Sequence, residues 1–304
     1  MSNTTEQVNE SQFVLIRAEY IWVEGKENSI VRSKSRFLRV NNKDFKLPSW
    51  YEGDKILMPK ISFRNPLGYG ENDIISLCEA VNVTVKKELI RTPDNFRKLV
   101  VDELEYLKKH ELSVAIEETL DITFIGNFDQ KFNKLKEELV RCAFLSNISI
   151  ESVGYNNNKL TYRIDISNPV MVADSVVIIR YLLHQIMLKH ELSGVINNTN
   201  GTVNVEFCDK RMSDVNNSVE AMRLINSRLQ LLLESFGQKH RLPLTTILAG
   251  TGGIVDTSFK PLSDPYLMCL TVISYHKKLN EKEDEINRES EKLKTIIENE
   301  VERV

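Results

Sequence analysis

The stretch SVAIEETLDI, residues 113–122, carries Glu117, Glu118 and Asp121 within five positions. Carboxylates gathered in this way are the ligands that Mg²⁺ and Ca²⁺ prefer in proteins. The flanking apolar and β-branched residues predict a strand. Because successive side chains of a strand point to opposite faces, Glu117 and Glu118 cannot bind the same metal ion. The three acids therefore do not form a cluster.

A second candidate is the basic segment SIVRSKSRFLRV, residues 29–40. Its alternation predicts the second strand of a hairpin with one basic face. The cations in it could contact a partner or the phosphates of nucleic acid: Arg32, Lys34, Arg36 and Arg39. The segment lacks the interleaved aromatic residues of a base-stacking platform, so we favour a solvated face or a protein interface.

Other reactive residue types favour structural roles. The glycine-rich segment 248–256 lacks the GxxxxGK[ST] order of a phosphate loop, so we expect a flexible turn. The four cysteines stand singly, without a CxxC pair or histidines at metal spacing. We expect free thiols in a reducing compartment, and no disulfide or zinc framework.

Composition limits the class of protein. The 304 residues carry a net charge of −3 and are 41% apolar, so a globular core is expected without a global basic field for nucleic acid or membranes. The polar N-terminus lacks the apolar core of a signal peptide, and we identified no apolar stretch typical of a membrane span. We expect a cytoplasmic protein.

The elements that position these residues predict an α+β fold. Predicted strands cover residues 13–25, 29–40, 56–63, 73–83, 113–125, 147–153, 159–166 and 201–208. Predicted helices cover residues 92–110, 128–145, 171–192, 213–239 and 264–279. We divide the chain into a disordered arm (1–12), a β-rich domain (13–91), a larger α/β domain (92–279) and a charged helical tail (280–304).

Several segments, in order, resemble eukaryotic-type glutamine synthetase. They are AEYIWVEG with RSKSR, LPSW, the run ILMPKISFRNPLGYGENDIISLCEA, RYLLHQI and LSDPYLMCLTVISYHKKL. The resemblance spans residues 14–279. It implies a small N-terminal β-grasp domain and a larger C-terminal catalytic-like domain. It also implies ATP-dependent glutamine synthesis, with divalent cations held by carboxylates and a histidine.

At most of the positions that the resemblance matches to the family's metal ligands, this chain carries a residue of another type. Glu117 matches one carboxylate of the first metal-binding strand, whereas Ala115 stands in place of its partner. The remaining ligand positions fall on Thr161, Asn204 and, approximately, Val255. Since a metal needs several converging ligands, the resemblance implies a pseudoenzyme with no cofactor, no metal and Glu117 as a vestigial ligand.

We therefore expect a catalytically inactive binding or regulatory protein. The expected partner is a protein or ribonucleoprotein, and the ribosome is the leading candidate. The shortened catalytic segments argue against a homo-oligomeric ring. One alternative is a regulatory subunit that co-assembles with an active glutamine synthetase. A weaker alternative is an ATP-dependent ligase of changed specificity.

Overall fold

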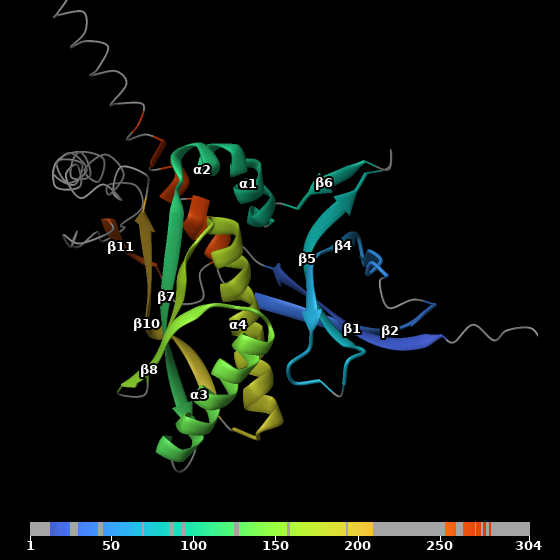
Figure 1. Ribbon diagram of the computed structural model, residues 1–304, viewed down its shortest axis with the longest axis horizontal. Helices are drawn as coiled ribbons and strands as arrows, with labels where there is room; N and C mark the ends of the chain where they lie inside the picture. Colours follow the sequence, from blue (N-terminus) through green and yellow to red (C-terminus); the bar gives the residue numbers. More distant parts are fainter. Residues whose placement is uncertain are drawn as a thin grey trace, which may run out of the picture. The chain divides into compact units, whose positions relative to one another are not determined.

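The computed structural model shows a mixed α+β protein with two sheets and several helices (Figure 1). It describes residues 13–24, 30–41, 45–68, 70–84, 88–92, 95–124, 128–156, 159–192, 194–208, 253–259, 264–270, 272–274, 276–277 and 280. The predicted arm (1–12), the predicted helix at 213–239 and nearly all of the tail (280–304) lie outside these residues. The α+β class predicted from the sequence is confirmed.

The chain forms two compact units. Unit 1 contains residues Met1–Asn95, Phe124–Ser149 and Val177–Gly194. Unit 2 contains residues Phe96–Thr123, Ile150–Val176 and Val195–Val304. The long helix α4 (Pro169–Lys189) contributes its first turns to unit 2 and the rest to unit 1.

The sheet of unit 1 follows the predicted hairpin and adds four strands. Its strands are β1 (Val14–Glu24), β2 (Ile30–Val40), β3 (Trp50–Glu52), β4 (Lys55–Arg64), β5 (Asp73–Val83) and β6 (Leu89–Arg91). Their order is β2-β1-β5-β4-β3, with β6 paired to β5. The β1–β5 pair is parallel and the other pairs are antiparallel. The short strands β3 and β6 were not predicted.

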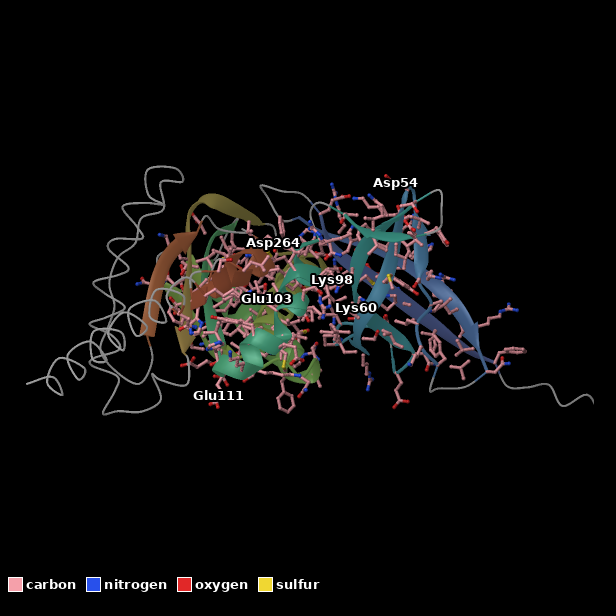
Figure 2. All side chains as sticks on the ribbon, turned by 90° about the horizontal axis from the view of Figure 1, so that it is seen from above. Asp54, Lys60, Lys98, Glu103, Glu111 and Asp264 are labelled. Atoms are coloured by element: carbon pink, nitrogen blue, oxygen red, sulfur yellow. The ribbon has the colours of Figure 1, made fainter. Side chains whose placement is uncertain are left out.

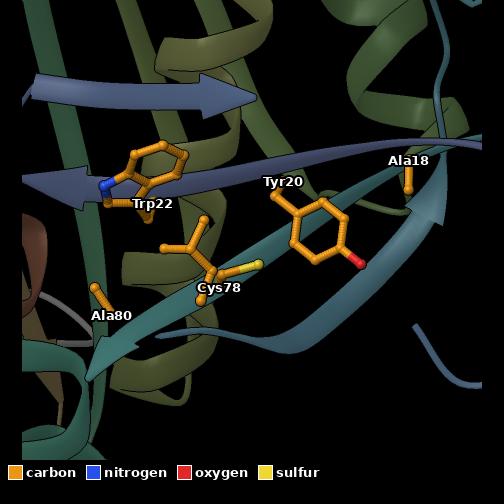
Figure 3. Packing of buried hydrophobic residues seen from close by; sticks show 6 residues of the cluster. Ala18, Tyr20, Trp22, Cys78 and Ala80 are labelled. Carbon is orange, nitrogen blue, oxygen red and sulfur yellow. The ribbon is translucent and has the colours of Figure 1, made fainter. Parts of the chain in front are cut away.

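One face of this sheet carries the unit's apolar cluster. Tyr20 and Trp22 of β1 pack with Leu57 of β4 and Cys78 of β5, and all four are nearly inaccessible to solvent (Figure 3). The Tyr20 hydroxyl donates to the carbonyl of Pro48 at 2.7 Å, so the phenol is satisfied although its ring is buried. Burial also raises the pKa of Cys78 to about 12, as expected of a core thiol.

The helices of unit 1 are α3 (Phe128–Leu145) and the later part of α4. By length and composition α4 could cross a membrane, but 78% of its most apolar stretch is buried inside the protein. A largely buried apolar helix is typical of a protein core. The sequence analysis did not identify this segment because Asp174, Arg180 and His184 interrupt its apolar residues.

Unit 2 contains the strand that opened the sequence analysis. Its elements are α1 (Phe96–Asp102), α2 (Leu104–His110), β7 (Ser113–Phe124), β8 (Ile150–Asn156), β9 (Lys159–Ser167), β10 (Gly194–Cys208) and β11 (Gly253–Phe259). The five strands are ordered β11-β10-β7-β9-β8 (Figure 1). This order places β7 at the centre, between β9 and β10.

Two local predictions in unit 2 were wrong. The single helix expected over 92–110 is interrupted at Glu103, so that α1 and α2 are separate elements (labelled in Figure 1). The segment 248–256, expected to be a turn, overlaps strand β11. Its pairing with β10 compensates for the low strand propensity of glycine, because ladder hydrogen bonds depend on the partner strand rather than on the side chain.

Candidate functional site

The two faces of β7 separate its neighbouring acids, as the sequence predicted. Glu118 is fully buried, like Ile116 and Leu120 on the same face, whereas Glu117 is only half-buried. The Tyr162 hydroxyl of β9 donates a hydrogen bond to the Glu118 carboxylate. Because a buried polar group needs a partner, this contact gives Glu118 a structural role.

Ala115, the position that the resemblance matches to a metal-binding carboxylate, is fully buried. It lies where the register between β7 and β9 shifts, between Val114 and Ile116. All three residues are buried, so the strict alternation of the strand is interrupted here. A carboxylate at this position would be placed in an apolar environment, at a large desolvation cost.

Glu117 and Asn204, two positions matched to family ligands, are brought together by the fold. The Asn204 amide nitrogen of β10 donates a hydrogen bond to the Glu117 carboxylate, with 3.4 Å between Nδ2 and Oε1. An amide nitrogen has no lone pair to offer a metal, whereas an imidazole does. With its nitrogen turned towards Glu117, Asn204 therefore satisfies the carboxylate by a hydrogen bond and not through a shared metal ion.

The strand opposite Glu117 provides a cation. Arg163 of β9 is the residue directly across from Glu117 in the antiparallel register. The Arg163 guanidinium also forms an ion pair with Glu151 of β8. A guanidinium on the same sheet face disfavours a divalent cation there, because like charges repel.

The rest of this face is built from complementary pairs. Thr161, matched to a further ligand, lies across from Thr119, and their hydroxyl oxygens are 3.0 Å apart. Asp121 lies across from Lys159. Facing hydroxyls and opposite charges are the pairs that stabilise a solvated sheet face. The arrangement is that of a packed ladder rather than of an open ligand set.

Val255 has only its backbone described, and it pairs with Val205 of β10. Its hydrocarbon side chain contains no atom that could bind a metal. Within the described ranges, no group of three or more His, Cys, Asp or Glu side chains is arranged to hold a metal ion.

The basic residues of β2 do not form a single face. Arg32, Lys34 and Arg36 alternate along one side, but the uninterrupted register with β1 places Arg39 on the other side, across from Leu15. The expectation of one face with four cations was therefore wrong for Arg39.

Acids and an indole ring already engage the three cations that share a face. Arg32 pairs with Glu24 at 3.2 Å, and Lys34 pairs with Glu52 at 2.5 Å. The Lys34 ammonium and the Arg36 guanidinium lie 5.1 Å and 5.4 Å from the centre of the Trp50 ring. These contacts partly neutralise the face and support the protein-interface interpretation over binding of bare phosphates.

A pocket in unit 1 was not predicted. It has a volume of 380 Å³ and is lined by residues of β1, of the turn after β4 and of α4, with Arg17, Leu67, Tyr181, Gln185, Leu188 and Lys189 among them. These three segments are far apart in sequence and contain no motif. The spacing of Tyr181, Gln185 and Leu188 on one helix face was the only available signal.

Comparisons with known proteins leave the family open. No protein-family model matches the chain, and no curated protein matches it.

Proposed function

We propose that this chain is a catalytically inactive protein of the glutamine-synthetase type that acts as a binding or regulatory factor. The observation that carries the proposal is the environment of Glu117, the one carboxylate retained at the matched ligand positions. Its neighbours on the sheet are the amide of Asn204 and, across the register, the cation Arg163.

Loss of the reaction follows from electrostatics. Formation of a γ-glutamyl phosphate from ATP needs divalent cations that neutralise the phosphate charge. A site that offers one carboxylate beside a guanidinium gives a divalent cation little net attraction. Each missing anionic ligand also removes stabilisation of the charged transition state, so the losses compound.

The fold expected from the resemblance also belongs to the proposal. The parallel β1–β5 pair within a mostly antiparallel sheet supports a β-grasp-like N-terminal domain. The five-stranded sheet of unit 2, with helices before and between its strands, supports a degenerate catalytic-like domain. These assignments rest on topology and on the order of the resembling segments.

The proposed partner is a protein or a ribonucleoprotein in the cytoplasm, with the ribosome as the first to test. The ion pairs on β2 favour contact with a protein surface over contact with naked RNA. Sedimentation of the purified chain with ribosomes at low salt tests this choice. If it neither cosediments with ribosomes nor binds ribosomal RNA, the ribosome is excluded.

The loss of activity has a separate test. The chain is incubated with ATP, Mg²⁺, glutamate and ammonia, and phosphate release is measured beside an active glutamine synthetase. We expect no release above the buffer rate. Release that requires both glutamate and ammonia would overturn the proposal, and release with another acid and amine would indicate a ligase of changed specificity.

A further inference from the structure

Strand β8 forms one edge of the unit 2 sheet. Strand β9 pairs with one side of it, and no strand in the described part of the chain pairs with its other side. The backbone N–H and C=O groups along such an edge can pair with a strand of another chain. The outer side of β8 is therefore a candidate docking edge.

The side chains of β8 extend the buried apolar face of the sheet. Val153 lies across from Tyr162, and Tyr155 lies across from Leu160. The two β9 residues are fully buried, whereas Val153 and Tyr155 are only half-buried. A further strand at this edge would continue the apolar face and remove more of it from water.

A bulge limits the part of β8 that can pair regularly with another strand. The register with β9 shifts between Ile150 and Ser152, which leaves Glu151 as the extra residue of β8. The Glu151 carboxylate forms an ion pair with Arg163 of β9. The pairing is regular from residue 152 to residue 156, so this segment is the part of the edge that suits a partner strand.

The regular segment has the sequence SVGYN and contains no charged residue. Two copies of it, antiparallel about a two-fold axis at Gly154, place Val153 across from Tyr155 of the second copy. The same register places Ser152, which is exposed, across from the exposed Asn156 of the second copy. An apolar pair thus forms on the buried face and a polar pair on the solvated face, without opposed like charges.

The glycine at the centre of this segment is not required by its own chain. A Cβ atom at Gly154 would meet no atom within 4 Å, and the φ angle of Gly154 lies outside the left-handed region. Glycine weakens a strand interior, and it often marks a site where another backbone approaches closely. A strand that crosses a two-fold axis at Gly154 would be such a backbone.

We propose that β8 pairs antiparallel with β8 of a second copy of the chain, about a two-fold axis at Gly154. The pairing joins the unit 2 sheets of the two copies into one sheet. Because the interface is isologous, it closes after two copies and gives a dimer rather than a ring. The inference goes beyond the proposed function and does not depend on the loss of the synthetase reaction.

Other pairings fit the observations less well. Strand β2 is also a sheet edge, but two copies paired about its midpoint Ser35 would place Lys34 across from Arg36. Cations on an edge strand discourage such pairing. An extended peptide of another protein would gain the same backbone hydrogen bonds at β8, but the uncharged segment offers it no charge to recognise. A second copy matches the segment residue by residue.

Cysteine cross-linking tests the register. Gly154→Cys places two thiols on directly opposite residues, whose Cα atoms lie about 4.5–5.5 Å apart in an antiparallel pair, within the reach of a disulfide. Ser152→Cys is the matched control, because its two copies would lie four residues apart along the strands, about 14 Å from each other. On mild oxidation of the full chain we expect a covalent dimer for Gly154→Cys alone, above the background that the parent chain's own thiols give. Gly154 and Ser152 are both exposed, so both variants should fold.

Sedimentation velocity at high micromolar chain concentration measures the assembly without a cross-link. We expect the parent chain to be dimeric. Gly154→Lys should raise the dimer dissociation constant by about tenfold or more, because two lysines would face each other at the axis. Gly70→Lys is the matched control, since a Cβ atom at Gly70 also meets open space but the residue lies in unit 1. It should dimerise like the parent chain.

Four results would overturn the inference. They are a monomeric parent chain, no cross-linking of Gly154→Cys, equal cross-linking of the two cysteine variants, and a dimer that Gly154→Lys weakens no more than Gly70→Lys does. The last result would mean that another surface holds the two copies together. None of these results changes the outcome of the phosphate-release assay, so the two proposals fail separately.

Discussion

The Asn204 amide nitrogen lies 3.4 Å from the Glu117 carboxylate oxygen and donates a hydrogen bond to it, across from β10 to β7. This contact joins two residues that are 87 positions apart in the sequence. It turns a potential metal ligand into an acceptor for a neutral amide. The chemistry that Glu117 can perform is therefore decided by its neighbours rather than by its own carboxylate.

Replacing Asn204 tests that relationship. Asn204→His places an imidazole beside Glu117, and we expect Co²⁺ to bind at least about tenfold more tightly than to the parent chain, because imidazole is a good ligand for this metal. The visible absorption of bound Co²⁺ measures the affinity. Asn204→Ala removes the amide without adding a ligand and is the control. Equal Co²⁺ binding by the two variants would contradict the geometry.

The ion pair between Arg97 and Asp174 in unit 2 should contribute strongly to stability. The two side chains are 13% and 3% exposed, and the guanidinium makes two hydrogen bonds, at 2.9 Å and 3.0 Å. Tyr266 donates a further hydrogen bond to the same carboxylate. Arg97→Ala leaves that carboxylate buried without its cation, so we expect the free energy of unfolding in urea to fall by about 3 kcal/mol or more.

Lys98→Ala is the matched control for that variant, since it removes the neighbouring cation (Figure 2). Lys98 and Asp102 form an exposed pair one helical turn apart, and we expect a loss of about 0.5 kcal/mol or less. Similar losses for the two variants would show that the Asp174 environment is not buried in solution.

Gly68 should tolerate no side chain. A Cβ atom at this position would lie 2.3 Å from the Asp73 carboxylate oxygen, and Asp73 is held by Arg17. Gly68→Ala should displace that carboxylate and lower the free energy of unfolding by about 1–3 kcal/mol. Gly70→Ala meets open space and should change it little. Thermal unfolding of the two variants decides, and equal midpoints would contradict the close approach.

The fold was more predictable from sequence than the site. Apolar alternation correctly predicted β7 and the separation of Glu117 from Glu118, because a strand period of two follows from local geometry. Strand β11 and the interruption at Glu103 were missed. In β11, pairing with β10 outweighs the weak propensity of glycine, and such a non-local contribution leaves no local pattern.

The pocket of unit 1 could not be predicted from local sequence patterns either. The pocket collects Arg17, Leu67 and Leu188 from three separate segments, so the helical spacing within α4 was not enough to reveal it. Arg39 was assigned to the wrong face of β2 because it was grouped with the other cations by its charge. Its odd-numbered position places it on the face opposite to that of Arg32, Lys34 and Arg36. Strand alternation applied strictly would have corrected that assignment.

Glu138 on α3 should make stability depend on pH at the acidic end. Hydrogen bonds from the Arg141 guanidinium, at 2.7 Å and 2.8 Å, lower the pKa of Glu138 to about 2 from an ordinary value of 4.5. The ionised form is therefore favoured by folding. Its contribution is fully present above about pH 4.5 and is lost as the pH falls towards about 2.

Arg141→Gln removes this contribution. We expect it to lower the free energy of unfolding by about 1 kcal/mol at neutral pH, a modest value because the Arg141 side chain is 44% exposed. The difference from the parent chain should shrink as the pH approaches 2. Lys136→Gln on the same helix is the control. A difference that does not change between pH 7 and pH 2 would rule out the ion pair as its cause.

Isothermal titration of the full chain with ATP and Mg²⁺ tests the central claim most directly. Glu117 beside Asn204 and across from Arg163 offers too little negative charge to hold the cations that bring a nucleotide into such a site. The account predicts no Mg²⁺-dependent heat up to millimolar nucleotide, with an active glutamine synthetase as the positive control. Saturable, Mg²⁺-dependent binding at micromolar nucleotide would contradict it.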